Sequence, residues 1–573
     1  MTISFTLYRF IIIAAAVLAA LTPLFVVLYQ SFLTAPFLAS TARLSLAAYR
    51  FVFADEDFAV AFGTTLLLSA SMTLIAVPLG VMLAFLMVRT NVPARQWLEP
   101  VMLVPIFIPS VVLAFGYVAA LGPAGMLTTW FEAWTGRPAW NLYSFSFLVA
   151  IAGLTHVPHA YLYTAGALRA LGTELEEAAR AAGAGAWKVA LGVSLPMVLP
   201  AILSAGVLVF FFGFELFGLP LVLGDPQGLL VLSTYLFKLG GRLGVQANQF
   251  MAVAAVIVIA IALPLAFMQR ALLREAQRHV PTRNRSARAA PHKLGRWRWP
   301  VLVIIALWLA ATVLVPLAGI TLRSVTGSWK KGTALLQALT FDHYRELLDH
   351  GDALRSIANT LAIGLLGGAA ALACYAALAL AVHRRPIHCR TFHHRTFHHR
   401  TWRWTQAVDY LVMAPRAMPG LVAGLALLWV LLLLKPLTPL RETLASVWLA
   451  YAILWMAYGL RVVSGSLLQV NPELEDAARA VGAAEARVRR DITLPLIRNA
   501  LLASWLLIFL VFVREYATGV YLLAPGTEVM GSLLVSLWEN GMADLVAPLA
   551  VVNVAIIGAG LVIANRLGVR LHG

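Results

Sequence analysis

The stretch ELEEAARAAGAGAWKVALGVSLP, residues 174–196, recurs as ELEDAARAVGAAEARVRRDITLP at residues 473–495. The two copies align without a gap at an offset of 299 residues, and 12 of the 23 positions are identical. Self-similarity over such a distance predicts that the chain consists of two copies of one module.

Each copy is a polar segment between long apolar ones. Charged side chains such as Glu176 and Glu177 cost about 2.5–3.5 kcal/mol each at the centre of a bilayer, so the segment is predicted to lie outside the lipid. Residues 174–182 are rich in Ala and Glu, which favours a helix. Gly183 is predicted to end that helix because glycine adopts positive φ without strain, and Pro196 is predicted to open the next apolar segment.

The spacing of acidic, small and proline residues resembles the EAA loop of permease subunits in ATP-binding-cassette importers. Asp476 departs from the usual Glu of that motif but keeps the negative charge. The resemblance implies that each copy is a coupling loop, which docks into a cleft on a cytoplasmic ATPase subunit. The predicted coupling residues are Glu176, Glu177, Ala178, Ala179, Gly183, Leu195 and Pro196, with Glu475, Asp476, Ala477, Ala478, Gly482, Leu494 and Pro495 in the second copy.

The composition identifies an integral membrane protein. Of the 573 residues 61% are hydrophobic and only 12% are charged, more apolar surface than a water-soluble fold could bury. The net charge of +17 could suggest a nucleic-acid partner, but its distribution along the chain favours positively charged loops on the cytoplasmic side, and we expect no nucleic acid. The two cysteines form no disulfide framework, and no catalytic or metal-ligand set is recognisable.

Twelve segments are long and apolar enough to cross a bilayer. We therefore predict an all-α membrane protein of two tandem parallel six-helix repeats. The predicted spans are 8–29, 60–88, 98–121, 143–168, 197–221, 248–268, 300–322, 356–382, 408–434, 444–466, 496–523 and 545–565. Pro105 and Pro109 interrupt the third span, and Pro415 and Pro419 interrupt the ninth in the same pattern, so the repeat extends beyond the coupling loops.

The predicted modules are residues 1–268 and 300–573, joined by a basic cytoplasmic linker, 269–299. With both termini in the cytoplasm, the inner loops and tails hold 26 Lys plus Arg and the outer loops 12. This assignment also places both coupling loops on the cytoplasmic side. The predicted location is a bacterial inner membrane, with a retained first helix and the linker against anionic lipid headgroups.

The sequence allows two interpretations for each of two groups of residues. Segment 390–401, RTFHHRTFHHRT, could ligate a metal through its four histidines, but a tandem duplication in a permissive loop is the favoured interpretation, and no metal site is predicted. Ionisable residues inside spans are candidates for the transport path, with local packing as the alternative. These path candidates are Glu215, Glu515, His156, His159 and Arg416.

The region from Glu215 to Gln269 also resembles the fused permeases of ferric-iron importers. This implies an importer permease that moves ferric iron, with two ATPase subunits below it and a periplasmic binding protein outside. No GxxxxGK[ST] motif is present, so ATP and Mg are expected on the partner ATPases and the chain is not expected to be an enzyme or to bind a cofactor. The alternatives are the same role for aminoethylphosphonate, thiamine, sulfate or a polyamine, or a secondary ion-coupled transporter.

Overall fold

The structure is a computed structural model, and it describes residues 2–172, 174–278, 292–327, 338–383 and 407–567. Within these ranges the chain is helical, and its β-structure is limited to isolated bridges such as Thr90 with His292. Ten described helices are long and apolar enough to cross a membrane, and two bent helix pairs bring the number to twelve. Each of the twelve overlaps a predicted span, which confirms the predicted fold class.

The chain packs as two compact units, and each is described by itself. The first-repeat unit holds the described residues of Tyr49–Asp349 and Leu537–Val552. Its helices are α2 (Ala47–Ala54), α3 (Glu56–Arg89), α4 (Arg95–Met102), α5 (Val104–Phe107), α6 (Ser110–Leu121), α7 (Met126–Thr135), α8 (Phe145–Ala170), α9 (Glu174–Ala181), α10 (Ala186–Val189), α11 (Leu195–Glu215), α12 (Leu232–Leu243), α13 (Asn248–Arg278), α14 (Arg298–Leu309), α15 (Val315–Ser324) and α16 (Asp342–Asp349).

The second-repeat unit holds the described residues of Met1–Ala48, His350–Ser536 and Asn553–Val569. Its helices are α1 (Thr2–Ser31), α17 (Gly351–Ala362), α18 (Gly368–His383), α20 (Gly420–Leu433), α21 (Leu444–Leu454), α22 (Met456–Leu468), α23 (Pro472–Ala480), α24 (Glu485–Val488) and α25 (Leu494–Arg514). Three of the described helices contribute residues to both units: α2, whose first two residues belong here, α26 (Met530–Glu539) and α27 (Ala543–Arg566).

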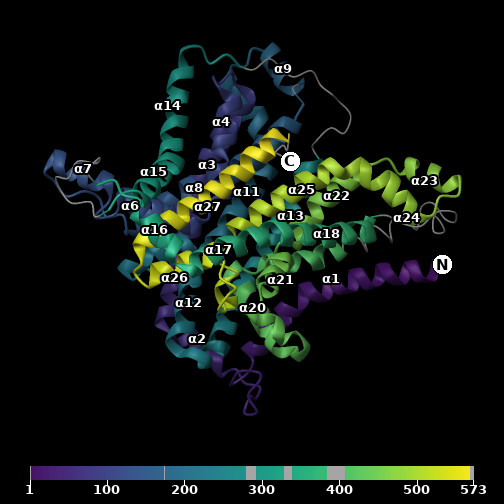
Figure 1. Ribbon diagram of the computed structural model, residues 1–573. Coiled ribbons are helices and arrows are strands. Elements are labelled where there is room, and N and C mark those ends of the chain that lie inside the picture. The colour runs from purple at the N-terminus through teal and green to yellow at the C-terminus, as the bar shows by residue number, and fades with distance from the viewer. Residues whose placement is uncertain (1, 173, 279–291, 328–337, 384–406, 568–573) are drawn as a thin grey trace. The chain divides into compact units, whose positions relative to one another are not determined.

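The first helix of each repeat packs with the helices of the other repeat. Figure 1 shows α1, in purple, beside the green helices α18 and α20, and α14 and α15, in teal, beside the earlier helices of the chain. Arg9 of α1 donates a 2.9 Å hydrogen bond to the carbonyl of Ala381 in α18, and Tyr117 of α6 donates one of 2.9 Å to the carbonyl of Ala311. The predicted module boundaries concern the sequence repeat and remain a prediction, which this division by packing does not test.

The third span of each repeat is broken at the same proline. Pro109 precedes the first residue of α6, and Pro419 precedes the first residue of α20. The residue before each proline is extended, with ψ of 131° at Ile108 and 127° at Met418, because the proline ring excludes helical geometry there. In the second repeat the helical segments on either side of the break meet at 103°.

The segment after the fifth span is buried in both repeats, although the sequence predicts an outer loop there. The amide of Leu232, the first residue of α12, donates a 2.8 Å hydrogen bond to the buried hydroxyl of Thr65 in α3. The amide of Met530, the first residue of α26, donates a 2.9 Å hydrogen bond to the buried hydroxyl of Thr360 in α17. Each short helix thus begins on a hydroxyl of the second span, which satisfies an amide that the helix itself leaves unpaired.

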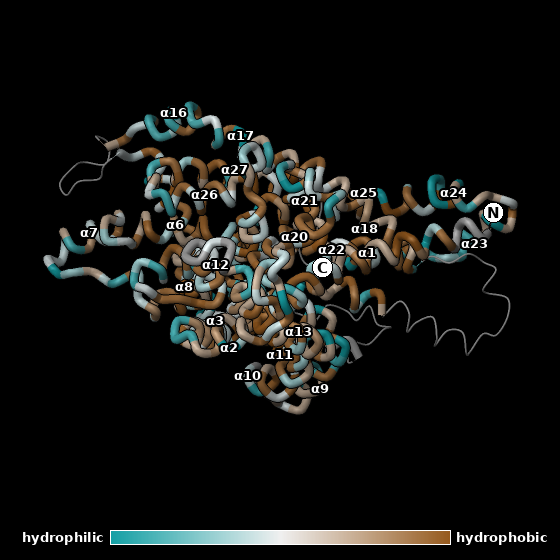
Figure 2. Tube along the Cα trace, turned by 90° about the horizontal axis from the view of Figure 1, so that it is seen from below, coloured by the Kyte–Doolittle hydropathy of each residue, from teal (hydrophilic) through white to brown (hydrophobic). Residues whose placement is uncertain are grey.

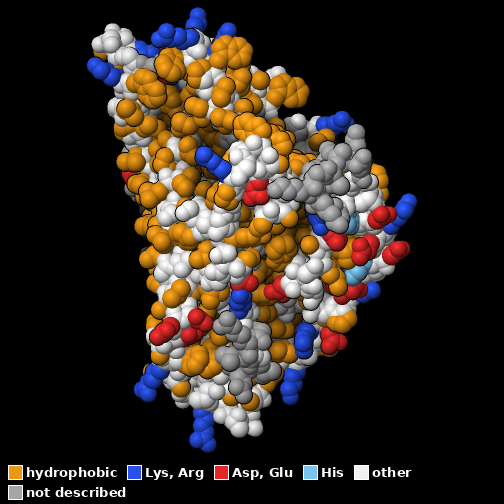
Figure 3. Space-filling model, turned by 90° about the vertical axis from the view of Figure 1, so that its left-hand side faces the viewer, with side chains coloured by type: hydrophobic (Ala, Val, Ile, Leu, Met, Phe, Trp, Pro, Cys, Tyr) orange, Lys and Arg blue, Asp and Glu red, His pale blue; other side chains and the backbone are white. Residues whose placement is uncertain are grey.

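Much of the surface of the spans is apolar. Large side chains such as Leu74 and Leu366 are about three-quarters exposed, at 75% and 74%. Figure 3 shows hydrophobic side chains over most of one face, with the Lys and Arg side chains gathered mainly toward its edges. Such a surface is stable only against lipid, since exposed apolar patches of this extent are rare in water-soluble proteins.

Candidate functional site

The two coupling loops have the helix–break–helix form that the sequence predicts. In the first loop α9 ends before Gly183, which has φ of 85°, and in the second α23 ends before Gly482, which has φ of 88°. The amide of Gly183 bonds the carbonyl of Arg180, and the next amide bonds the carbonyl of Ala179. Gly482 closes α23 with the same two bonds, so each glycine provides the left-handed residue of a helix C-cap.

Glu176 anchors the first loop from inside the protein. Its side chain is 1% exposed, and its Oε1 accepts a 2.8 Å hydrogen bond from the hydroxyl of Ser194. Arg89, at the end of α3, donates a 2.9 Å hydrogen bond to the same oxygen, and the guanidinium of Arg180 lies 3.6 Å from Oε2. A buried carboxylate is stable only when it is paired and hydrogen-bonded, so these contacts fix the position of α9 against the spans.

Glu475 has the equivalent position in the second loop. It is 3% exposed, and its Oε1 accepts a 2.8 Å hydrogen bond from the hydroxyl of Thr493. Ser194 and Thr493 each end a short π-helical turn, Ala190–Ser194 and Arg489–Thr493. Because the proline two residues later lacks an amide hydrogen and crowds the carbonyl four residues before it, regular α-helical bonding is interrupted here.

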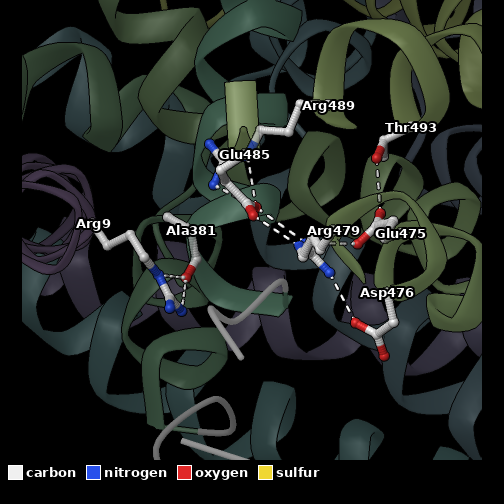
Figure 4. A network of polar contacts seen from close by, with 8 residues as sticks. All are labelled: Arg9, Ala381, Glu475, Asp476, Arg479, Glu485, Arg489 and Thr493. Atoms are coloured by element: carbon white, nitrogen blue, oxygen red, sulfur yellow. Dashed lines mark hydrogen bonds and ion pairs between the residues drawn. The ribbon is translucent and has the colours of Figure 1, made fainter. Parts of the chain in front are cut away.

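An arginine network further braces the second loop (Figure 4). Arg479 lies 3.3 Å from Glu475, 3.0 Å from Asp476 and 2.9 Å from Glu485. Arg489 lies 3.4 Å from Glu485 on the other side. At the position of Glu485 the first loop has Ala186, so the two loops share the buried carboxylate but differ in what surrounds it.

The outward face of each loop is partly apolar. Glu176 and Glu177 are adjacent in α9 and therefore point about 100° apart, so one is buried and the other is exposed. The equivalent residues Leu175 and Leu474 are 55% and 50% exposed, and Ala178 and Ala477 also lie on the surface. Figure 2 shows hydrophilic colouring at α23 and α24 against the hydrophobic colouring along α25. Leu175 with Ala178, and Leu474 with Ala477, are three residues apart and so share the outward face of their helices.

The remaining predicted coupling residues lie at the exposed edges of the loops. Asp476 is about one-third exposed and pairs with Arg479, and Ala179 and Ala478 are half-buried. Leu195 is half-buried and Pro196 exposed at the start of α11, and Leu494 and Pro495 are exposed at the start of α25. Glu176 and Glu475 are the members of the predicted set that support the loop from within.

The path candidates of the second repeat meet where three helices are interrupted. The guanidinium of Arg416 lies 4.9 Å from the centre of the Trp455 ring, a cation–π contact. Trp455, between α21 and α22, donates a 3.1 Å hydrogen bond from Nε1 to the carboxylate of Glu515. Glu515 directly follows α25, and its other carboxylate oxygen accepts a 2.9 Å hydrogen bond from the hydroxyl of Thr518. Glu515 therefore has partners within its own repeat, and its role in the transport path stays a prediction.

The first repeat has a different pair of rings at the equivalent place. At the same offset of 299 residues His156 corresponds to Trp455, and His159 corresponds to Tyr458. The rings of His156 and His159 stack with 5.4 Å between their centres, and the His159 ring packs edge-on against Phe212 at 4.8 Å. The two glutamates have similar places at the end of the fifth span: Glu215 is the last residue of α11, and Glu515 directly follows α25. Extending the repeat register beyond the coupling loops would have identified Trp455, which sequence reasoning missed.

Histidine segment 390–401 lies outside the described residues. Among the residues that the structure describes, no group of three or more His, Cys, Asp or Glu side chains is arranged to hold a metal ion.

We expect Glu176→Ala to loosen the first coupling loop selectively. The change leaves Arg89, Arg180 and the Ser194 hydroxyl without their common partner, and breaking a buried ion pair typically costs about 3–5 kcal/mol. Amide hydrogen exchange of the full chain in lipid nanodiscs should become faster across residues 174–194 and stay unchanged across 473–493.

The matched control is Glu177→Ala, which removes the same side chain from the exposed neighbouring position. It should leave exchange in both loops at the wild-type rate. Equal protection of the first loop in Glu176→Ala and in the wild type would contradict the anchoring role.

Comparison with known proteins yields one family. The model of the family described as "Binding-protein-dependent transport system inner membrane component" matches residues 76–278 and 398–572, which contain both coupling loops. The chain is 25% identical over 460 residues to the probable ABC transporter permease protein y4fN of Sinorhizobium fredii, covering 76% of this chain and 74% of that protein.

Two further relatives differ in the substrate that their names give. The ferric transport system permease protein FbpB of Actinobacillus pleuropneumoniae is 21% identical over 444 residues, 77% of this chain and 61% of its own length. The putrescine transport system permease protein PotI of Escherichia coli is 27% identical over 211 residues, 36% of this chain and 72% of its own length. With two matched modules and, in the part of the chain that the structure describes, up to twelve helices long and apolar enough to cross a membrane, the chain belongs to the family of binding-protein-dependent transport system inner membrane components and is a multi-pass inner membrane protein.

Proposed function

We propose that the chain is the membrane permease of an ATP-binding-cassette importer, driven by two separate ATPase subunits. The observation that carries this proposal is the repeated coupling loop, in which a buried glutamate holds an exposed helix on the following span in each repeat. Two loops of one design in one chain supply one docking site for each ATPase. ATP and Mg are then bound by the partner subunits, since the sequence has no GxxxxGK[ST] motif.

The buried contacts suggest how ATP-driven movement would reach the membrane. Glu176 bonds Ser194 at the start of the fifth span and Arg89 at the end of the second. A displacement of α9 by the ATPase would therefore act on two spans at once. Glu475 bonds Thr493 in the same way, so each loop would move its own repeat and open the path alternately outward and inward.

The orientation that follows places both coupling loops and both termini in the cytoplasm. The excess of Lys and Arg in the loops on this side supports it. A periplasmic binding protein would then deliver the substrate to the outer face, as the family description implies.

For the substrate we propose ferric iron. The support is the ferric permease relative, whose alignment extends over 77% of this chain, whereas the putrescine relative aligns with 36%. The high-affinity iron site would belong to the binding protein, because weak contacts in the permease allow release. The same importer role for a polyamine or an aminoethylphosphonate is the alternative, and the putrescine relative favours the former.

Uptake of labelled Fe(III) by cells with and without this gene tests the proposal, with the partner ATPase and binding protein present. We expect uptake that depends on the gene and stops when ATP is depleted. Labelled putrescine and 2-aminoethylphosphonate serve as comparison substrates in the same cells. Uptake of one of these in place of Fe(III) would overturn the iron assignment, and ATP-independent uptake would overturn the importer.

Gly183→Val should reduce uptake while the protein still inserts into the membrane. A Cβ at this position meets no atom within 4 Å, so the cost comes from the left-handed backbone, about 1–2 kcal/mol for a residue with a Cβ. The matched control is Gly185→Val, in equally open space without positive φ, which should transport normally. Equal uptake by the two variants would contradict the need for this helix end.

The two acidic path candidates can be separated by Glu→Gln changes. If Glu215 contacts a cationic substrate, Glu215→Gln should lower the rate of Fe(III) uptake, since the charge is lost and the shape is kept. Glu515→Gln should change uptake little, because an amide oxygen can still accept from Trp455 or Thr518. Unchanged uptake in the double variant would assign both residues a packing role.

A further inference from the structure

The end of the linker between the repeats is bonded to the end of the second span, whose Arg89 in turn bonds Glu176 of the first coupling loop. The amide of His292 donates a 2.9 Å hydrogen bond to the carbonyl of Arg89, and the amide of Asn91 donates one of 3.1 Å to the carbonyl of His292. The amide of Leu294 donates a 2.8 Å hydrogen bond to the side-chain oxygen of Asn91. These three bonds join residues 292–294 to the segment that follows α3, in a short parallel bridge.

The side chain of His292 completes this contact. Its Nε2 lies 2.8 Å from Nη2 of Arg180, the arginine of α9 that also pairs with Glu176. A guanidinium carries only donors, so Nε2 of His292 must be the acceptor of this bond. An imidazole accepts only when it is neutral, with its proton on Nδ1. The contact therefore exists in one protonation state of His292.

The charges around His292 oppose its protonation. The groups that face it are Arg180 and Glu176 of α9 and Arg89 of α3, and Lys293 follows it in the chain. Partial burial, followed by the charge of Arg180, lowers the pKa of His292 from its usual 6.5, against the smaller opposite effect of Glu176. Since the folded pKa lies below the unfolded value, the contact is complete above about pH 6.5 and is lost as the pH falls through the lower folded value.

The described contacts of the second loop contain no histidine. There Arg479 is held by Glu475, Asp476 and Glu485. Burial alone would lower the pKa of Arg479, but its bond to Glu485 and the nearby carboxylates raise it overall, so this arginine stays charged. Acidification within the range of histidine titration therefore leaves the second loop intact.

We propose that His292 is a proton-sensitive latch, which ties the linker to the first coupling loop at neutral pH and releases it when the cytoplasm becomes acidic. Release withdraws the acceptor from Arg180 and places a second cation beside it. The first loop then loses one of its supports while the second keeps all of its own. On the proposed function, this makes transport sensitive to cytoplasmic pH through one of the two ATPase contacts.

The latch is tested by amide hydrogen exchange of the full chain in nanodiscs, corrected for the intrinsic effect of pH. In the wild type, protection of the amides of Asn91 and His292 should fall as the pH drops below about 6.5, while Gly482 and Ala483 keep theirs. His292→Gln supplies a permanent neutral acceptor and should stay protected at both pH values. His292→Lys supplies a permanent cation and should be unprotected even at neutral pH.

Lys293→Gln, at the exposed neighbouring position, is the control and should titrate as the wild type does. Equal protection of the wild type at neutral and acidic pH would overturn the latch. So would the same loss of protection in His292→Gln, because that variant has no group to titrate at this place.

The consequence for transport is measured separately, as Fe(III) uptake into proteoliposomes of the assembled importer at different internal pH. Acidification inside should slow the wild type and leave His292→Gln unchanged. Identical pH profiles of the two would overturn the effect on coupling. An absence of Fe(III) uptake at every pH would instead count against the proposed substrate, and the exchange measurement would still decide the latch.

Discussion

A buried carboxylate that accepts a hydroxyl hydrogen bond from the next span holds each coupling loop in place. Glu176 with Ser194 and Glu475 with Thr493 repeat this contact at the same distance of 2.8 Å. Separating the pair inside the protein would leave a desolvated charge, at a cost of several kcal/mol. The loop helix and the start of the fifth span are therefore obliged to move as one piece, and everything proposed about coupling depends on that rigidity.

Features that arise from local chemistry could be predicted from the sequence. The length of the apolar segments identifies the twelve spans, because a helix must cover the bilayer with apolar side chains. Pro109 and Pro419 mark helix breaks, because proline restricts the residue before it wherever it occurs. Gly183 and Gly482 end the loop helices, since the left-handed conformation requires glycine. Each of these signals lies within a few residues of its structural effect.

Features that arise from packing could not be predicted in this way. Glu176 and Glu177 are neighbouring residues of one type, and only the position of α9 against Ser194 and Arg89 decides which is buried. Trp455 looks like an ordinary membrane aromatic, yet it joins Arg416 to a glutamate 60 residues away. The first amides of α12 and α26 bond the hydroxyls of Thr65 and Thr360, each more than 160 residues distant in the chain.

The packing of α1 has a consequence for how the protein is made. Arg9 meets Ala381 across 372 residues of sequence, so α1 leaves the ribosome long before these partners are synthesised. At roughly 5–20 residues per second, α1 waits in the membrane for on the order of tens of seconds before α18 and α20 appear. During that time its contacts with α18 and α20 are not yet formed. The two repeats thus cannot mature one after the other, and the second-repeat unit is completed only when both halves of the polypeptide are in the same bilayer.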